Sequence, residues 1–476
     1  MKRFVIKKAL LIIPSLLILS IVVFLLSKIA PGDPVGNLIE LRGQTTASLN
    51  TSMHSDNYQE VATELGLDKP NFYFGIHPAS YPDTFYRIIH PQRKMIYSKW
   101  IEQIHNWDKI QSFNQCLAGF EETLLNTTDS IELTAAFKQI ASELRNVSSD
   151  PDIYTGFGHI ASISKILDSV SFFQNALLQD QLQKLNQSVD DIKSVEIQYK
   201  TAIPMLAFYG LDNQYHNWIK KVLRFDFGIS MVDAETVYNK ISYALFWTFL
   251  YVITAYILSL FIAIPLGLVS AWWYKKWTEK LISGFSFGFY AFPLFWLATL
   301  SVVFLTNNIY SDWLNIFPSV GVGRISNQMS LFEKITTAMP HLILPALILA
   351  IHSAAQGIRI IRNSAIVELK SDYFITAKAK GLSNVKLLWR HIFPNAMLPV
   401  ITMLISSFPA ALAGSVVLEV IFNIPGLGRL LYDSIHFMDW NVVFAILLFI
   451  GLVTFIFYLL GDILYAYLNP KIKLEA

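Results

Sequence analysis

The sequence has almost no cysteine and few charged residues. Cys116 is the single cysteine among 476 residues, which excludes an internal disulfide and a cysteine-based metal site. Only 15% of the residues are charged, whereas about a quarter are charged in a soluble globular chain. Together with 53% hydrophobic residues, this deficit indicates a membrane protein.

Sequence motifs that would indicate catalysis are also missing. There is no G-x-x-x-x-G-K-[ST] phosphate loop and no His-Glu-x-x-His pair, and His90, His105 and His159 lack metal-ligand spacing. Gly284–Gly288 matches G-x-S-x-G, but that pattern needs a strand-to-helix turn to expose its serine. Here it opens an apolar run, where small residues are expected to allow close helix packing. We therefore predict no catalytic residue, cofactor or metal site, and reject an intramembrane hydrolase.

Six apolar runs are long enough to cross a bilayer, which takes about 20 residues. They are Ala9–Ile29, 243–273, 281–306, 337–358, 396–418 and 441–465. Pro265 and Pro293 lie inside two of them, where membrane helices tolerate proline as a kink. The first run could also be a signal peptide, but its length and the lack of a small-residue cleavage site favour an anchor.

Basic residues in the short connecting segments predict the orientation of these spans. They cluster at the N-terminus, at Lys275–Lys280, in the loop 359–395 and in the C-terminal tail. These four segments alternate correctly for six spans if all four are cytoplasmic. Both termini are then expected inside, and residues 31–240 outside.

Residues 71–214 are more acidic and contain no spanning run. Apolar residues at helical spacing in Asp129–Leu144 and Ile160–Leu185 predict amphipathic helices. We expect a mostly helical inserted domain at about 75–214. Its role is open between docking or gating and simple stabilisation.

Residues 371–395, SDYFITAKAKGLSNVKLLWRHIFPN, interrupt two apolar runs with basic and small residues. Ser371 is a candidate N-cap for a helix over Tyr373–Lys380, and Gly381 can adopt the left-handed conformation that ends it. Ser383 can cap a second helix, and Pro394 marks its exit. The pattern predicts a rigid cytoplasmic protrusion; the alternative is an amphipathic helix on anionic lipid.

This stretch resembles the coupling motif of ABC importer permeases, E-A-A-x-x-x-G-x9-I-x-L-P. The spacing from Gly381 to Pro394 fits, whereas the leading E-A-A is Ile375-Thr376-Ala377, and His391 and Phe393 replace the Ile and Leu. The form T-A-K-A-K-G-L is similar to the B-type permease subunit of dipeptide/oligopeptide ABC transporters.

Other segments resemble the same branch and occur in its order. They are Ala30–Pro34, Leu65–Pro70, Phe225–Ser230, and Gly414–Phe422 followed by Pro425–Gly428. The resemblance covers about residues 1–74 and 215–476, and the intervening insertion has no counterpart in it.

The resemblance implies an all-α membrane protein with six transmembrane helices, the ABC type I importer permease fold. Residues 1–30 would be the first span, 31–240 the extracytoplasmic region with its mostly helical insertion between helices 1 and 2, and 241–476 the five-helix core with the coupling loop 359–395. The chain would be a transport subunit of the bacterial plasma (inner) membrane, without an ATP site of its own. It would form half of the translocation path of an importer for di- or oligopeptides.

The implied partners are separate ABC ATPase subunits, a second permease subunit of the C type, an extracytoplasmic substrate-binding protein and a peptide or other small solute; no nucleic acid is expected.

The resemblance assigns ATPase coupling, through residues 371–394, to Asp372, Tyr373, Thr376, Ala377, Ala379, Gly381 and Pro394. The alternative function is a membrane-anchored sensor or scaffold that uses the extracytoplasmic domain.

Polar residues inside the spans are candidates for the path or its gate. Glu419 could line the path, but a structural contact with the turn Pro425–Gly428 is favoured. His352 and Gln356 could also face the path, with interhelical hydrogen bonding as the alternative. Asp462 is expected to pair with a basic residue such as Lys471.

Overall fold

The computed structural model describes residues 2–42, 51–126, 134–169, 176–194, 203–307, 312–326, 328–414 and 416–468. The chain divides into two compact units, and each has its own hydrophobic core. One unit combines Met1–Gly32 with Arg224–Ala476, and the other is Asp33–Leu223. The second unit therefore interrupts the sequence of the first after one helix.

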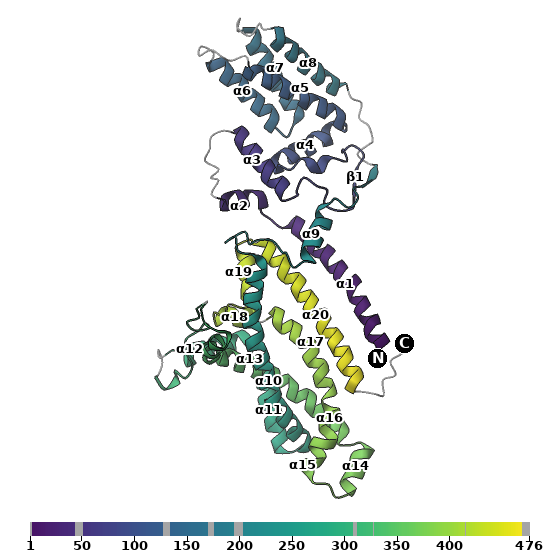
Figure 1. Ribbon diagram of the computed structural model, residues 1–476, viewed down its shortest axis with the longest axis vertical. Helices are drawn as coiled ribbons and strands as arrows, with labels where there is room; N and C mark the ends of the chain where they lie inside the picture. Colours follow the sequence, from purple (N-terminus) through teal and green to yellow (C-terminus); the bar gives the residue numbers. More distant parts are fainter. Residues whose placement is uncertain are drawn as a thin grey trace. The chain divides into compact units, whose positions relative to one another are not determined.

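The first unit is helical (Figure 1). Four of its helices are long and apolar enough to span a membrane: α1 (Lys2–Ile29), α10 (Val237–Trp272), α13 (Leu331–Glu368) and α20 (Trp440–Leu468). Two bent segments pass the same test, α11 (Trp277–Ala291) with α12 (Leu294–Leu305), and Asn384–Ala396 with α17 (Leu398–Gly414). Counting each bent segment once gives up to six spans, as the six apolar runs predict. The shorter elements are η5 (Asp312–Leu314), α14 (Asp372–Ala379), α15 (Asn384–Leu387), the π-helix η6 (Leu388–Ile392), α16 (Phe393–Ala396), α18 (Val416–Ile421) and α19 (Leu427–His436).

The run 281–306 differs from the single kinked span that the sequence predicts. Helices α11 and α12 meet at 91°, and the chain between them is Phe292-Pro293. Phe292 is extended, with φ −74° and ψ 131°, because a residue before proline is disfavoured in the helical region. The proline therefore ends one helix here, whereas Pro265 lies inside the continuous helix α10.

Helices α10 and α13 make the most extensive helix contact of the described chain. Glycines allow their close approach: a Cβ at Gly267 would lie 2.7 Å from Ile361 Cβ, and one at Gly357 would lie 3.0 Å from Ala263 Cβ. Small residues at such contacts let two membrane helices pack through their backbones. This pair forms the central part of the helical unit.

Helix α1 packs along α20, the last helix (Figure 1). Lys8 Nζ lies 3.0 Å from an Asp462 carboxylate oxygen, and Trp440 Nε1 donates a hydrogen bond to Pro31 O at 2.6 Å. Asp462 thus pairs with a basic residue, as predicted, and that residue is Lys8; Lys471 lies outside the described residues. The ion pair brings the first turns of α1 to the C-terminal part of α20.

The second unit consists of short helices around its own core. They are α2 (Pro34–Leu41), α3 (Thr51–Glu64), η1 (Phe85–Arg87), α4 (Pro91–Ile104), α5 (Trp107–Asn126), α6 (Thr134–Ser149), α7 (Ile153–Ser169), α8 (Ala176–Lys193) and α9 (Gln214–Val222). Trp100, Phe113 and Phe120 are fully buried in the core of α4–α8. The predicted stretch Ile160–Leu185 includes parts of two helices, α7 and α8, and its residues 170–175 lie outside the described residues. The other stretch, Asp129–Leu144, includes part of α6, and its residues 129–133 also lie outside them.

A two-stranded antiparallel sheet corrects the prediction of an all-α protein. Strand β1 (Phe74–Pro78) pairs with β2 (Pro204–Phe208), and the register places Pro78 opposite Pro204. The two strands flank the inserted helices in sequence. The sheet therefore brings both ends of the insertion together.

Candidate coupling and translocation sites

The predicted coupling helix is present as α14, Asp372–Ala379. Ser371 occupies the N-cap position, but its hydroxyl donates to Glu368 O at 2.6 Å instead of accepting from the first turn of α14. Ser371 is therefore the N-cap residue, as predicted, but it lacks the side-chain capping hydrogen bond. Gly381 follows the helix with φ +77°, the left-handed conformation expected of it.

The two faces of α14 have different environments. Phe374 and Ala377 are buried in a cluster of the protein's own core that includes Ala271 and Leu387. Ala377, assigned to coupling, therefore faces inward and is not accessible to a partner. The outward face carries Asp372, Ile375, Thr376 and Ala379, which are exposed at helical spacing.

Ile375 was not among the predicted coupling residues, although its side chain is 59% exposed. Val385 and Trp389 in the following helices are also large, apolar and exposed. Exposed apolar patches mark surfaces that contact another protein or the membrane. The sequence carries no signal for Ile375, because the outward face of α14 is defined by contacts of its inner face with residues distant in sequence.

Tyr373 connects α14 to the two segments beside it. Its hydroxyl hydrogen-bonds the Glu368 carboxylate at the end of α13 and lies 3.2 Å from His391 O. Asn395 Nδ2, in α16, donates to the same hydroxyl at 2.9 Å. Burial, and then the hydrogen bond to Glu368, raise the pKa of Tyr373, so the hydroxyl stays protonated at neutral pH. We call this set of four residues the Tyr373 junction.

The chain after the glycine turn is more irregular than predicted. Ser383 stands at the N-cap position of α15 but makes no capping side-chain bond. Pro394 lies in the first turn of α16, directly after the π-helix η6, instead of marking the end of a helix. Proline has no N–H for the helical ladder, and a π-turn is one way for a chain to adjust to that loss. Beyond it, the axis bends by 47° into α17.

Glu419 is fully buried in α18 and binds the start of α19. One carboxylate oxygen accepts from Thr248 Oγ1 at 2.8 Å and from Tyr251 OH at 3.3 Å, and the other accepts from Arg429 N at 2.9 Å. A Cβ at Gly426 would lie 2.4 Å from the carboxylate carbon. These contacts support the structural role at the Pro425–Gly428 turn.

His352 and Gln356 both lie on α13. The ring of His352 stacks on Tyr290 of α11, with centroids 5.7 Å apart, and Gln356 is exposed toward a cavity beside α11. Both residues thus face α11, and their role in the path stays a prediction.

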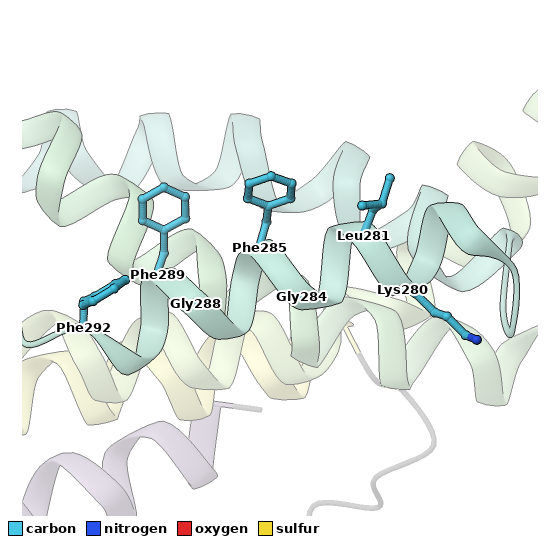
Figure 2. A pocket seen from close by; sticks show the side chains of 7 residues that line it. All are labelled: Lys280, Leu281, Gly284, Phe285, Gly288, Phe289 and Phe292. Carbon is cyan, nitrogen blue, oxygen red and sulfur yellow. The ribbon is translucent and has the colours of Figure 1, made fainter.

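The G-x-S-x-G segment has a helical geometry. Ser286 lies within α11, and its hydroxyl donates to Ile282 O at 2.7 Å, so no strand-to-helix turn exposes it. A groove of about 430 Å³ lies at Gly284 and Gly288. Figure 2 shows the phenylalanines that line it. A Cβ at either glycine would meet no atom of the described chain within 4 Å, so the expected close helix packing is wrong there.

Comparison with known proteins identifies the class of this membrane unit. A family model described as binding-protein-dependent transport system inner membrane component matches residues 263–474, which include α14 and its turn. The chain is 35% identical over 273 residues to the oligopeptide transport system permease protein AppB of Bacillus subtilis (strain 168), covering 56% of this chain and 83% of the relative. It is 33% identical over 268 residues to the glutathione transport system permease protein GsiC of Escherichia coli (strain K12), covering 56% and 81%. The chain therefore belongs to the family of binding-protein-dependent transport system inner membrane components, and it is a permease subunit of an ABC importer.

Proposed function

We propose that α14 and the glycine turn after it couple this permease to a separate ABC ATPase subunit. The observation that carries the proposal is the outward face of α14, where Asp372, Ile375, Thr376 and Ala379 are exposed on a helix whose inner face is anchored by Phe374 and Ala377. A short helix fixed on one side and open on the other can transmit a push or a pull.

The Tyr373 junction gives this coupling a mechanical route. Movement of α14 would be passed to the end of α13 through Glu368, and to α16 and then α17 through Asn395. Closure of the ATPase pair would thereby tilt α13 and α17 and alternate the access of a path between two permease subunits. The permease has no ATPase activity of its own, so ATP hydrolysis drives the cycle from the partner.

The substrate we propose is a di- or oligopeptide, which is imported. This rests on two relatives, an oligopeptide permease and a glutathione permease. A second permease subunit would complete the path, and an extracytoplasmic binding protein would deliver the peptide.

We place both termini and α14 on the cytoplasmic side, and Asp33–Leu223 outside. The positions of the basic segments support this orientation. The ion pair between Lys8 and Asp462 supports it independently, because it puts the start of α1 and the end of α20 at the same side of the helical unit.

Affinity purification of the tagged protein from its native membranes, followed by mass spectrometry of the bound proteins, tests the class of assembly. We expect an ABC ATPase and a second permease with several spans. Recovery of the protein alone, or only with extracytoplasmic proteins, would contradict the proposed ATPase and second-permease partners.

Two substitutions at Gly381 then test the coupling role. No atom of the described residues lies within 4 Å of a Cβ at this position, so within them a side chain acts only through the backbone, whose φ is +77°. A β-branched residue there costs about 1–2 kcal/mol of strain, whereas asparagine tolerates the left-handed conformation. We expect Gly381→Val to assemble and hydrolyse ATP with little transport, and Gly381→Asn to transport like the wild type. Wild-type transport by Gly381→Val would contradict the coupling role.

A further inference from the structure

Each of the contacting helices α11 and α13 carries a row of polar side chains. On α13 they follow the spacing i, i+4, i+7 and i+11, and the same spacing recurs on α11. The row on α13 is His352, Gln356, Arg359 and Asn363, and the row on α11 is Glu279, Ser283, Ser286 and Tyr290. This spacing keeps each row on one face of its helix. Polar groups aligned within membrane helices are functional candidates, because apolar residues would serve packing at lower cost.

A cavity of about 390 Å³ lies between the two rows. Its lining includes Gln356, Arg359, Ser283 and Tyr290, together with apolar side chains such as Phe287 and Ile360. A volume of this order is within the range of small-molecule sites, which typically begin near about 300 Å³. The mixed lining can hold an apolar side chain and a charged group of one ligand.

The cavity is lined by one acidic and two basic side chains, and Arg359 is the basic one that is not paired with the acid. Glu279 is paired with Arg362, with an Arg362 Nη2 to Glu279 Oε1 distance of 2.7 Å, and Ser283 Oγ donates to the same oxygen at 3.0 Å. Within the described ranges, neither Arg359 nor Gln356 has a hydrogen bond or ion pair through its side chain, and both are exposed. The site therefore presents a guanidinium and a side-chain amide, with its acidic residue already neutralised.

We propose that this cavity binds a carboxylate of the transported peptide on the cytoplasmic half of the path, with Arg359 as its cation and Gln356 as a hydrogen-bond donor. The guanidinium fork matches a carboxylate in two parallel hydrogen bonds, which favours a carboxylate over a neutral amide. The inference rests on the proposed transport of peptides and names a chemical feature of the substrate that this permease selects.

The test measures binding to the assembled permease–ATPase complex in nanodiscs, without nucleotide and without binding protein. The probes are trialanine and trialanine C-terminal amide, which differ in the carboxylate. We expect the wild type to bind the free acid about tenfold more tightly, as a hydrogen bond to a charged group predicts. Arg359→Gln should lose this preference, and Arg359→Lys should retain part of it.

Lys280→Gln is the matched control. It removes a positive charge from α11, but Lys280 lines the separate groove at Gly284 and Gly288 (Figure 2). We expect this variant to keep the tenfold preference. Equal binding of both peptides by the wild type, or an unchanged preference in Arg359→Gln, would overturn the proposal.

A lipid phosphate would satisfy the same cation, so the measurement is repeated with purely zwitterionic lipid and with added phosphatidylglycerol. Displacement of trialanine by the anionic lipid in the wild type, but not in Arg359→Gln, would assign the cavity to lipid and overturn the proposal. Failure of the proposed peptide transport is recognised separately, because the complete transporter with its binding protein would then not import peptides. Loss of preference in an ATPase-bound complex concerns the carboxylate site alone.

Discussion

At the scale of single residues, Glu419 shows how one carboxylate can organise a turn. It is the single buried acid of α18, and it accepts hydrogen bonds from Thr248 and Tyr251 of α10 and from the backbone of α19. Gly426 is required beside it, because a side chain there would meet the carboxylate. The motif G-S-V-V-L-E with P-G-L-G thus corresponds to a physical unit, an acid and the helix start that it holds.

Glu419→Ala should destabilise the helical unit, because it leaves buried donors without their acceptor. We expect a loss of about 2 kcal/mol or more in the free energy of unfolding. Glu419→Gln keeps one acceptor oxygen and should cost less. The measurement is the midpoint of thermal unfolding in detergent, with Asp433→Ala as control. Asp433 forms only an exposed pair with Arg429, 3.6 Å apart, so a loss in that variant as large as in Glu419→Ala would contradict the expectation.

At the scale of helices, the sequence predicts well which helices exist and which residues they span. It predicts poorly which face of a helix is buried and where a helix is interrupted. Helix α14 spans Asp372–Ala379, within one residue of the prediction, because Asp372 and Gly381 give strong local signals. Its inner face could not be predicted, since Phe374 and Ala377 are buried by residues distant in sequence such as Ala271. Pro265 and Pro293 look alike in their apolar runs. Only the packing differs: α10 continues past Pro265 along α13, whereas α11 turns into α12 at Pro293.

The contact between α10 and α13 allows a sharp prediction about glycine. Gly267→Val would place methyl groups where Ile361 already lies, and overpacking of this kind costs about 1–3 kcal/mol. Gly284→Val is the control, because a Cβ there meets nothing within 4 Å. We expect a lower unfolding midpoint for Gly267→Val and an unchanged one for Gly284→Val. A reversed order would show that α11, rather than α10, is the tightly packed helix.

Removing one hydroxyl should separate ATP hydrolysis from transport. Tyr373→Phe keeps the ring but loses the hydrogen bonds to Glu368 and Asn395 that link α14 to α13 and α16. The assembled transporter should still hydrolyse ATP, and the number of substrate molecules transported per ATP should fall. Tyr432→Phe, at an exposed tyrosine of α19, is the control. A proportional loss of hydrolysis and transport in Tyr373→Phe would indicate a merely structural role for the junction.

At the scale of the whole molecule, the chain consists of two units with separate cores. The family model begins at residue 263, so the match lies entirely in the helical membrane unit. Inside the second unit, Ala79 N donates to Ile203 O at 2.9 Å, directly beyond the pair Pro78 and Pro204. The insertion therefore leaves and returns at one point, the arrangement by which a domain can be added without disturbing its host.

This arrangement predicts that residues 79–203 fold when they are produced alone. Their core is contained within the segment, from Ile96 of α4 to Ile192 of α8, with fully buried residues such as Trp100, Phe113 and Phe120. We expect a monomeric, helical protein whose circular dichroism is lost in one cooperative thermal transition.

The complementary variant joins Pro78 to Pro204 through a two-residue Asn-Gly turn, which suits an antiparallel hairpin. That variant should still insert in the membrane and retain the ATPase, because the helices that carry α14 and the Tyr373 junction lie in the other unit. Non-cooperative unfolding of the isolated segment, or loss of the ATPase from the shortened permease, would show that the two cores depend on each other.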